Sequence, residues 1–211
     1  MLQLPLLFCG LLSLGSADVR LNLGAGPSFA VLPGSLGQRA PWAVGFDLDA
    51  AASVPASVAR DRAPAGMRSR IPSEGEVDVR PLWLGWIPGQ VVASPGGDLS
   101  LWGATWDLFG LGTRVPLGSV ASLRAHVQFP EFWWLHGDGP ATTGPNSSYG
   151  LGVAPLASLQ LDPWAWIRIS GGWTHHVGIP FGSIHLRTGA ESPWQWGSAW
   201  VMLTLRPPVR I

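Results

Sequence analysis

An alternation of apolar and polar side chains is the feature that most constrains this sequence. In the stretch LASLQLDPWAWIRIS, residues 156–170, apolar residues such as Leu159 and Ile169 occupy odd positions, whereas polar residues such as Gln160 and Arg168 occupy even positions. A period of two places the two kinds of side chain on opposite faces of a β-strand. If the apolar face points inward, the chain is a soluble barrel or sandwich; if it points outward, the surrounding solvent is lipid.

The same alternation recurs along most of the chain and predicts an all-β protein. The 28 glycines and 20 prolines disfavour long helices and suit strands joined by turns. No repeat of fixed period and no domain boundary is visible, so one domain is expected. Eight strands are predicted, at about 18–31, 41–56, 74–87, 99–115, 118–135, 147–162, 163–176 and 193–206.

The predicted connections differ in length at the two ends of the strands. Short turns follow the fourth and sixth strands, whereas loops rich in Gly, Pro, Ser or Asn are expected at 32–40, 88–98, 136–146 and 177–192. Short turns at one end and longer loops at the other are typical of outer-membrane barrels, whose short turns face the periplasm.

The segment 57–73 departs from this pattern, because it is long and charged at the end where a short turn is expected. It contains Arg60, Arg62, Arg68 and Arg70. Two interpretations stay open for it: a contact surface for a partner protein, or a disordered linker.

The first residues predict export. Residues 4–14 form an apolar run that is too short to span a bilayer, and small residues follow at Gly15-Ser16-Ala17. This pattern indicates a secretory signal peptide, residues 1–17, ahead of a mature barrel domain, residues 18–211. The single cysteine, Cys9, lies within the predicted signal, so no disulfide or thiol chemistry is expected in the mature chain.

The charge content is low and balanced. Charged residues make up 12% of the chain, about half the usual share of roughly 25%, and the formal net charge is zero. No nucleic-acid partner is therefore expected. The polar face holds small and amide side chains with a few charges of both signs, where a soluble surface would carry many Lys and Glu. The predicted polar lumen residues are Asp47, Asp49, Arg124, His126, Gln128 and Arg168.

Tryptophan is abundant, with 13 residues against a single tyrosine. Indole combines a wide apolar ring system with one N–H donor and so favours the interface between lipid and water. Many of the tryptophans cluster near predicted strand ends. The sequence predicts an interfacial aromatic girdle of Trp42, Trp133, Trp134, Trp164, Trp166, Trp173, Trp194 and Trp196.

With these features the chain resembles the small, eight-stranded outer-membrane β-barrel proteins of Gram-negative bacteria. The resemblance covers most of residues 18–211 and depends on the strand pattern rather than on a single motif. It implies an antiparallel up-and-down transmembrane β-barrel of about eight strands that sits in outer-membrane lipid. The apolar face of residues 156–170 is then expected to contact lipid. A barrel of this size has an interior that side chains fill, so an open pore is not expected.

The five histidines do not predict a catalytic or metal site. His175 and His176 are adjacent and point to opposite faces of a strand, and no carboxylate or cysteine is spaced to complete a site with His185. Barrel enzymes that cleave acyl chains place histidine and serine on one strand face, two residues apart, but no histidine here has that neighbour. No catalytic residue, metal or cofactor is therefore expected.

The favoured hypothesis is a non-enzymatic anchor or subunit of a cell-envelope complex that serves secretion, polymer export, adhesion or motility, with other envelope proteins as partners. The alternatives are a narrow channel or binder for small apolar solutes, and a secreted soluble β-barrel. An acyl-chain enzyme is the last of them, since it needs a histidine, a serine and an acid on one face.

Overall fold

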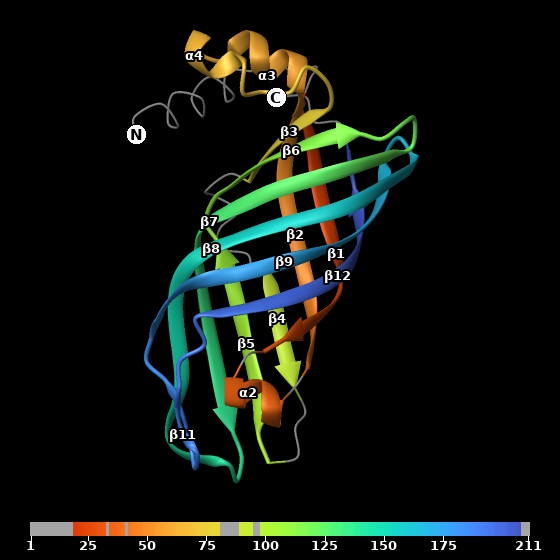
Figure 1. The fold of residues 1–211 in the computed structure, drawn as a ribbon. Helices are drawn as coiled ribbons and strands as arrows, with labels where there is room; N and C mark the ends of the chain where they lie inside the picture. Colours follow the sequence, from red (N-terminus) through yellow and green to blue (C-terminus); the bar gives the residue numbers. More distant parts are fainter. Residues whose placement is uncertain (1–18, 33, 41, 81–88, 95–97, 208–211) are drawn as a thin grey trace.

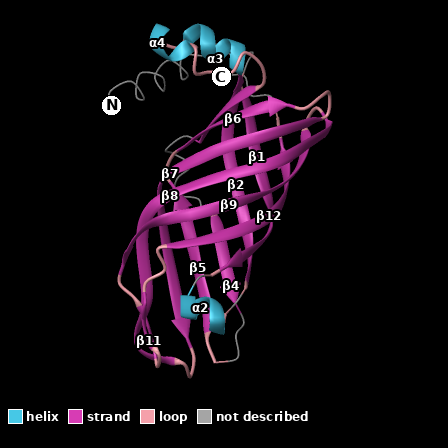
Figure 2. Cartoon of the chain, viewed as in Figure 1, coloured by secondary structure: helices cyan, strands magenta, loops and turns pink. Residues whose placement is uncertain are grey.

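The computed structural model describes residues 19–32, 34–40, 42–80, 89–94 and 98–207, and these form a tall ring of antiparallel strands with short helices at its two ends (Figures 1 and 2). In chain order, the elements are β1 (Arg20–Val31), α2 (Gly34–Arg39), β2 (Ala43–Pro55), α3 (Ala56–Arg62), α4 (Ala65–Arg68), β3 (Glu76–Arg80), β4 (Gln90–Ser94), β5 (Ser100–Asp107), β6 (Gly110–Pro116), β7 (Ala121–Asp138), β8 (Thr142–Trp164), β9 (Ile167–Phe181), β10 (Ile184–Leu186), β11 (Gly189–Glu191) and β12 (Gln195–Leu205). The predicted signal peptide lies outside the described residues.

Antiparallel pairing runs around the whole ring. β1 pairs with β2 on one side and with β12 on the other, and β7, β8, β9 and β12 follow one another in order. Between β2 and β7 the ring contains two interrupted strands. β3 and β4 pair with successive parts of β2, while β6 and β5 pair with successive parts of β7. If each interrupted pair is counted as one strand, the ring is the predicted all-β, up-and-down barrel of eight strands.

Three predicted loops are wrong because pairing continues beyond the predicted strand ends. β7 and β8 extend to Asp138 and from Thr142, so most of 136–146 is strand. β4 lies within 88–98, and 177–192 contains the end of β9 and the small hairpin of β10 and β11. The extension Thr142–Ser147 carries polar residues on both faces and therefore lacks the alternation that reveals a strand. The predicted third strand, 74–87, runs partly outside the described residues.

The polar face of the strands points into the ring. On β7, Arg124 and His126 are 5% and 3% exposed, whereas Leu123 and Val127 are 50% and 48% exposed. The opening stretch behaves in the same way: Ser158, Gln160 and Arg168 are buried, and Leu159 and Ile169 lie outside. The prediction that the apolar face of residues 156–170 points outward is confirmed. Since water would penalise so large an apolar surface, this arrangement fits a protein whose outer solvent is hydrocarbon.

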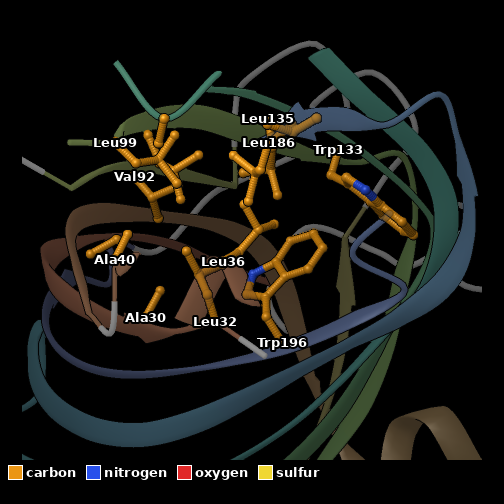
Figure 3. Close-up of a cluster of buried hydrophobic side chains, with 14 residues drawn as sticks. Ala30, Leu32, Leu36, Ala40, Val92, Leu99, Trp133, Leu135, Leu186 and Trp196 are labelled. Carbon is orange, nitrogen blue, oxygen red and sulfur yellow. The ribbon is translucent and has the colours of Figure 1, made fainter. Parts of the chain in front are cut away.

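The interior is itself divided along the axis. At the end where α2 lies, buried apolar side chains from several strands surround Leu36 of α2 (Figures 1 and 3). This apolar core includes Trp133 and Trp196, whose rings meet edge to face at 5.1 Å. The half of the ring nearer α3 is filled instead by charged and amide side chains. Neither half is an open lumen.

The α3–α4 segment, residues 56–75, lies at the opposite end of the ring from α2 (Figure 1). Val54, Val77 and Val79 occupy outward-facing positions on β2 and β3 but are buried. Ala56 and Ala59 of α3 pack against them, and Ile71 joins the same cluster. The segment therefore packs on the ring and covers part of its outer wall, and the interpretation as a disordered linker is wrong.

Replacement of Trp133 by alanine tests the apolar core. We expect Trp133→Ala to lower the free energy of unfolding by about 3–5 kcal/mol, because it removes a fully buried ring and leaves a cavity. The matched control is Trp134→Ala on the outer face, which loses an edge-on contact with Trp102 and is expected to cost about 1 kcal/mol. Urea unfolding of the detergent-folded protein, followed on gels, measures both. Equal losses for the two variants would contradict this assignment of faces.

Candidate functional site: the charged interior and the α3–α4 segment

The predicted lumen residues do lie inside the ring. Asp47, Arg124, His126, Gln128 and Arg168 are buried there, and the Asp49 carboxylate accepts a hydrogen bond from Arg124 at 2.8 Å. Each comes from the inward-facing set of its strand, so the alternation that predicted them also positions them. Their role as lumen-filling groups stays a prediction, since geometry alone assigns no function.

Asp78 of β3 is the centre of a buried ionic cluster. Its side chain is inaccessible to solvent and contacts Arg124 Nε at 2.7 Å and Arg114 Nη2 at 3.1 Å. Arg124 also pairs with Asp49, so one guanidinium links carboxylates from β2 and β3. Burial of unpaired charges would be prohibitive, and this pairing is what makes a charged interior tolerable.

Further ion pairs extend this cluster towards the α3 end. Arg206, just after β12, binds both oxygens of Glu76 at 2.7 and 2.8 Å and donates to Asn22 Oδ1 at 3.0 Å. Arg114 also contacts Glu76. Arg168 donates from Nε and Nη2 to the two carboxylate oxygens of Asp162, at 2.6 and 2.8 Å. The pairs join the first and last strands to the middle of the chain. Sequence analysis missed Asp78, Arg114 and Arg206, although alternation along each strand was a usable signal.

A second buried cluster brings together an acid, a histidine and a serine. His176 Nδ1 contacts the Glu131 carboxylate, and its Nε2 lies 3.4 Å from Ser198 Oγ. Trp196 stacks on the imidazole at a ring distance of 4.7 Å. The sequence analysis expected no such same-face group, and this expectation is wrong. It searched along single strands, whereas Glu131, His176 and Ser198 come from β7, β9 and β12.

The order acid, histidine, serine is the one that activates a serine nucleophile in hydrolases. Chemistry on an acyl group also needs room for the substrate beside the serine. Glu131 and Ser198 are inaccessible to solvent, and His176 is 3% exposed. The nearby interior cavity, which His176 and Asp107 help to line, has a volume of about 30 Å³. It holds about two water molecules and no acyl chain.

The predicted girdle tryptophans divide into two groups. Five are exposed on the outer face, and Trp134 is half-buried there: the exposed ones are Trp42, Trp164, Trp166, Trp173 and Trp194. Their interfacial role stays a prediction. The prediction is wrong for Trp133 and Trp196, which lie inside the apolar core.

The space for Trp133 comes from glycines on the neighbouring strands. A Cβ at Gly150 would lie 1.8 Å from the Trp133 ring, and one at Gly178 would lie 2.5 Å from it. The period of two already implies that adjacent Trp133 and Trp134 face opposite sides. Which of the two points inward depends on where the ring can be accommodated.

The four arginines of the α3–α4 segment, Arg60, Arg62, Arg68 and Arg70, are all exposed. Arg68 bends back to donate to the carbonyl oxygens of Ala63 at 3.0 Å and Asp61 at 3.3 Å. Ala56, Ala59 and Ala63 are buried on the opposite side of the segment. The segment is thus apolar towards the ring and cationic towards its surroundings.

Within the described residues, no cluster of three or more His, Cys, Asp or Glu side chains has an arrangement that could hold a metal ion. The helices of the described chain are all too short or too polar to cross a membrane.

No protein-family model matches the chain, and a comparison with curated proteins finds no match. Among solved structures, the chain is similar to the crystal structure of Neisserial surface protein A, with a TM-score of 0.43 and 10% identity over 92% of this chain and 97% of that one. It is also similar to Ail, the attachment invasion locus protein of Yersinia pestis, crystallised with the heparin analogue sucrose octasulfate, with a TM-score of 0.48 and 11% identity over 91% and 99% of the two chains.

A third similar structure is that of the Yersinia pestis outer membrane protein Ail in a phospholipid bilayer nanodisc, with a TM-score of 0.34 and 12% identity over 90% of this chain and 99% of that one.

The ring closure and the outward apolar face define the class of this chain independently: it has the fold of a small up-and-down β-barrel of the outer-membrane type.

Removal of the central carboxylate tests the ionic cluster. Asp78→Asn is expected to destabilise the ring by about 3–5 kcal/mol, because two buried guanidinium groups lose a counter-charge. Asp98→Asn is the matched control, since it breaks only the exposed pair with Arg39 and should cost about 0–1 kcal/mol. Urea midpoints on gels give both values. A loss for Asp78→Asn no larger than that of the control would show that the cluster does not carry the stability assigned to it.

Ser198 is expected to be unreactive in the folded protein, because the interior cavity admits no acyl or phosphonyl reagent. A fluorescent fluorophosphonate should label the folded wild-type chain no more than the Ser198→Ala variant. Labelling is read by in-gel fluorescence after the folded sample is exposed to the probe. Label that appears in the wild type and disappears in Ser198→Ala would instead identify an accessible, activated serine.

Proposed function

We propose that this chain is a non-enzymatic outer-membrane β-barrel that serves as an anchor or subunit of a cell-envelope assembly. The observation that carries the proposal is the reversed distribution of polarity: charged side chains fill the ring and apolar side chains cover its outside. In a bilayer the outer side chains meet hydrocarbon, and the closed ladder satisfies the backbone hydrogen bonds. Outer-membrane lipid is then the immediate surroundings of the wall.

The closed interior favours an anchor over the alternative of a channel. The cavity of about 30 Å³ holds about two water molecules, which is too little space for an apolar solute. Charged groups such as Asp47 and Asp107 are among the residues that line it. The alternative of a secreted soluble barrel needs the polar faces of the strands outside. In this ring it would instead leave Leu123 and Val127 in water.

The same closed interior is the reason why we propose no enzymatic role. Glu131, His176 and Ser198 are better explained as a buried hydrogen-bonded group that links three strands. Their geometry resembles a catalytic arrangement, but Glu131 and Ser198 are inaccessible to solvent, and the cavity beside His176 in the described part of the ring has a volume of about 30 Å³.

In this proposal, residues 1–17 are the export signal, and the outward tryptophans hold the ring at the level of the lipid headgroups. The α3–α4 segment faces the periplasm, where Arg60, Arg62, Arg68 and Arg70 form a cationic surface for an acidic envelope partner. Secretion, polymer export, adhesion and motility complexes all fit this role. The segment is ordered onto the ring, which presents these charges at little entropic cost on binding.

The experiment combines fractionation with cross-linking in cells. The protein is expected in the outer-membrane fraction, with a gel mobility that differs between boiled and unboiled samples because a closed barrel resists detergent. A photo-reactive amino acid at position 62 should give adducts with other proteins, whereas one at the exposed Gln38 of α2, at the other end, should give none of them.

Different results contradict different parts of the proposal. A buffer-soluble protein without a gel shift overturns the membrane barrel. A heat-modifiable barrel without position-specific adducts keeps the membrane location and overturns the partner surface.

A further inference from the structure

An apolar groove lies between the α3–α4 segment and the outer wall. Met67, Arg70 and Ile71 line it on one side, and Leu111, Val127 and Pro155, from β6, β7 and β8, line it on the other. Its volume is about 440 Å³, within the range of about 300–1,000 Å³ that is usual for small-molecule sites. Its lining also includes His126 and Leu156, which belong to the buried interior of the ring.

The wall side of the groove belongs to the surface that faces lipid. Ala125, Val127 and Pro155 are exposed and point outward on neighbouring strands, with Val127 opposite Pro155 in the register. A chain that enters the groove from the bilayer therefore crosses no polar barrier. The groove is lined almost wholly by apolar groups, which suits a hydrocarbon chain.

Two polar groups outside the ring, Arg70 and Thr113, select the chemistry of the occupant. A third polar residue that lines the groove, His126, belongs to the buried interior of the ring. Arg70 is exposed and lines the groove at the α4 end, beside Met67. Thr113 lines the groove too, and its buried hydroxyl has no hydrogen-bond partner within the described structure. Thr113 lies nearer to the α3 end of the wall than Leu111 does, because its register partner is Ala125 rather than Val127.

The groove therefore combines a cation, an unpaired hydroxyl and an apolar wall. An anionic phospholipid carries the complementary groups: a phosphate, ester oxygens and acyl chains. We propose that the groove binds one anionic phospholipid of the surrounding leaflet, with its phosphate at Arg70, an ester carbonyl accepting from Thr113 and one acyl chain along Leu111, Val127 and Pro155. This inference depends on the proposed membrane location.

Charge complementarity favours this occupant over a neutral one. The segment carries Arg60, Arg62, Arg68 and Arg70 against Asp61 and Glu74, an excess of positive charge at the level where headgroups lie. Of the four arginines assigned to the partner surface, Arg70 alone lines the groove, so the two proposed sites share this residue. A bound lipid would also fill the space beneath the segment and help to hold it on the wall.

Native mass spectrometry of the folded protein in a non-ionic detergent tests the site. Phosphatidylglycerol and phosphatidylcholine with identical acyl chains are titrated in parallel. The wild type is expected as a monomer that carries one phosphatidylglycerol and prefers it to phosphatidylcholine. Arg70→Gln should weaken phosphatidylglycerol binding about fivefold, because one arginine contributes about 1 kcal/mol to attraction of an anionic lipid surface, and leave phosphatidylcholine binding unchanged.

A second pair of variants tests the acyl chain. Ala125→Phe fills the groove and should abolish binding of both lipids, whereas Ala199→Phe makes the same change at an exposed position on β12 and should not. Arg60→Gln is the matched control for charge and should behave like the wild type. These outer-face substitutions leave the buried clusters intact, so each variant can be compared as a folded barrel.

Equal binding of the two lipids, or retention of phosphatidylglycerol preference in Arg70→Gln, would overturn the proposal. So would a lipid-free dimer lost on Ala125→Phe, which would make the groove an interface between two copies of the chain. The heat-dependent gel shift of the same samples reports on the barrel separately. If the protein shows the gel shift but binds no lipid, the lipid site is contradicted and the proposed membrane barrel is not.

Discussion

The pairing of buried charges is the constraint on which the rest of this structure depends. Once the apolar face of each strand points outward, its charged face has to fit inside a narrow ring. Arg124 meets this requirement by bridging Asp49 and Asp78, and Arg206 does so by binding Glu76. These bonds reach across the interior between strands that do not pair with each other in the sheet. Charged side chains that pair with one another in this way fill the interior and leave little space for a bound solute.

The interior of the ring is filled by different kinds of side chain at its two ends. Around Leu36 and Trp133 the interior is an apolar core like that of a soluble protein, closed by α2. Towards α3 the interior is ionic, and the apolar contacts move outside, where Ala56 and Ala59 cover Val54 and Val77. The functional surfaces proposed for this chain lie on the outer wall and at its ends, because side chains fill most of the interior that the structure describes.

Much of the fold could be predicted from the sequence, because alternation is a local property that each strand carries by itself. The six charged and amide lumen residues, including Asp47 and Arg168, were assigned to the correct side in this way. The same reasoning failed where a strand has no alternation of polar and apolar residues, or where alternation does not decide which face points inward. Polar strand extensions such as Thr142–Ser147 were taken for loops, and Trp196 was assigned to the surface. The Glu131, His176 and Ser198 group was missed because each member has an unremarkable position on its own strand.

The sequence by itself determined the strand class, the approximate strand count and the two-faced character of each strand, since these follow from residue order along one chain. Only the tertiary structure decided which side chains meet. The register between β7, β9 and β12 brings Glu131, His176 and Ser198 together, and the glycines at 150 and 178 make room for Trp133 inside. Packing of residues 56–75 against the wall likewise creates the groove beside Arg70. Such contacts depend on ring closure, which joins residues that no local pattern relates.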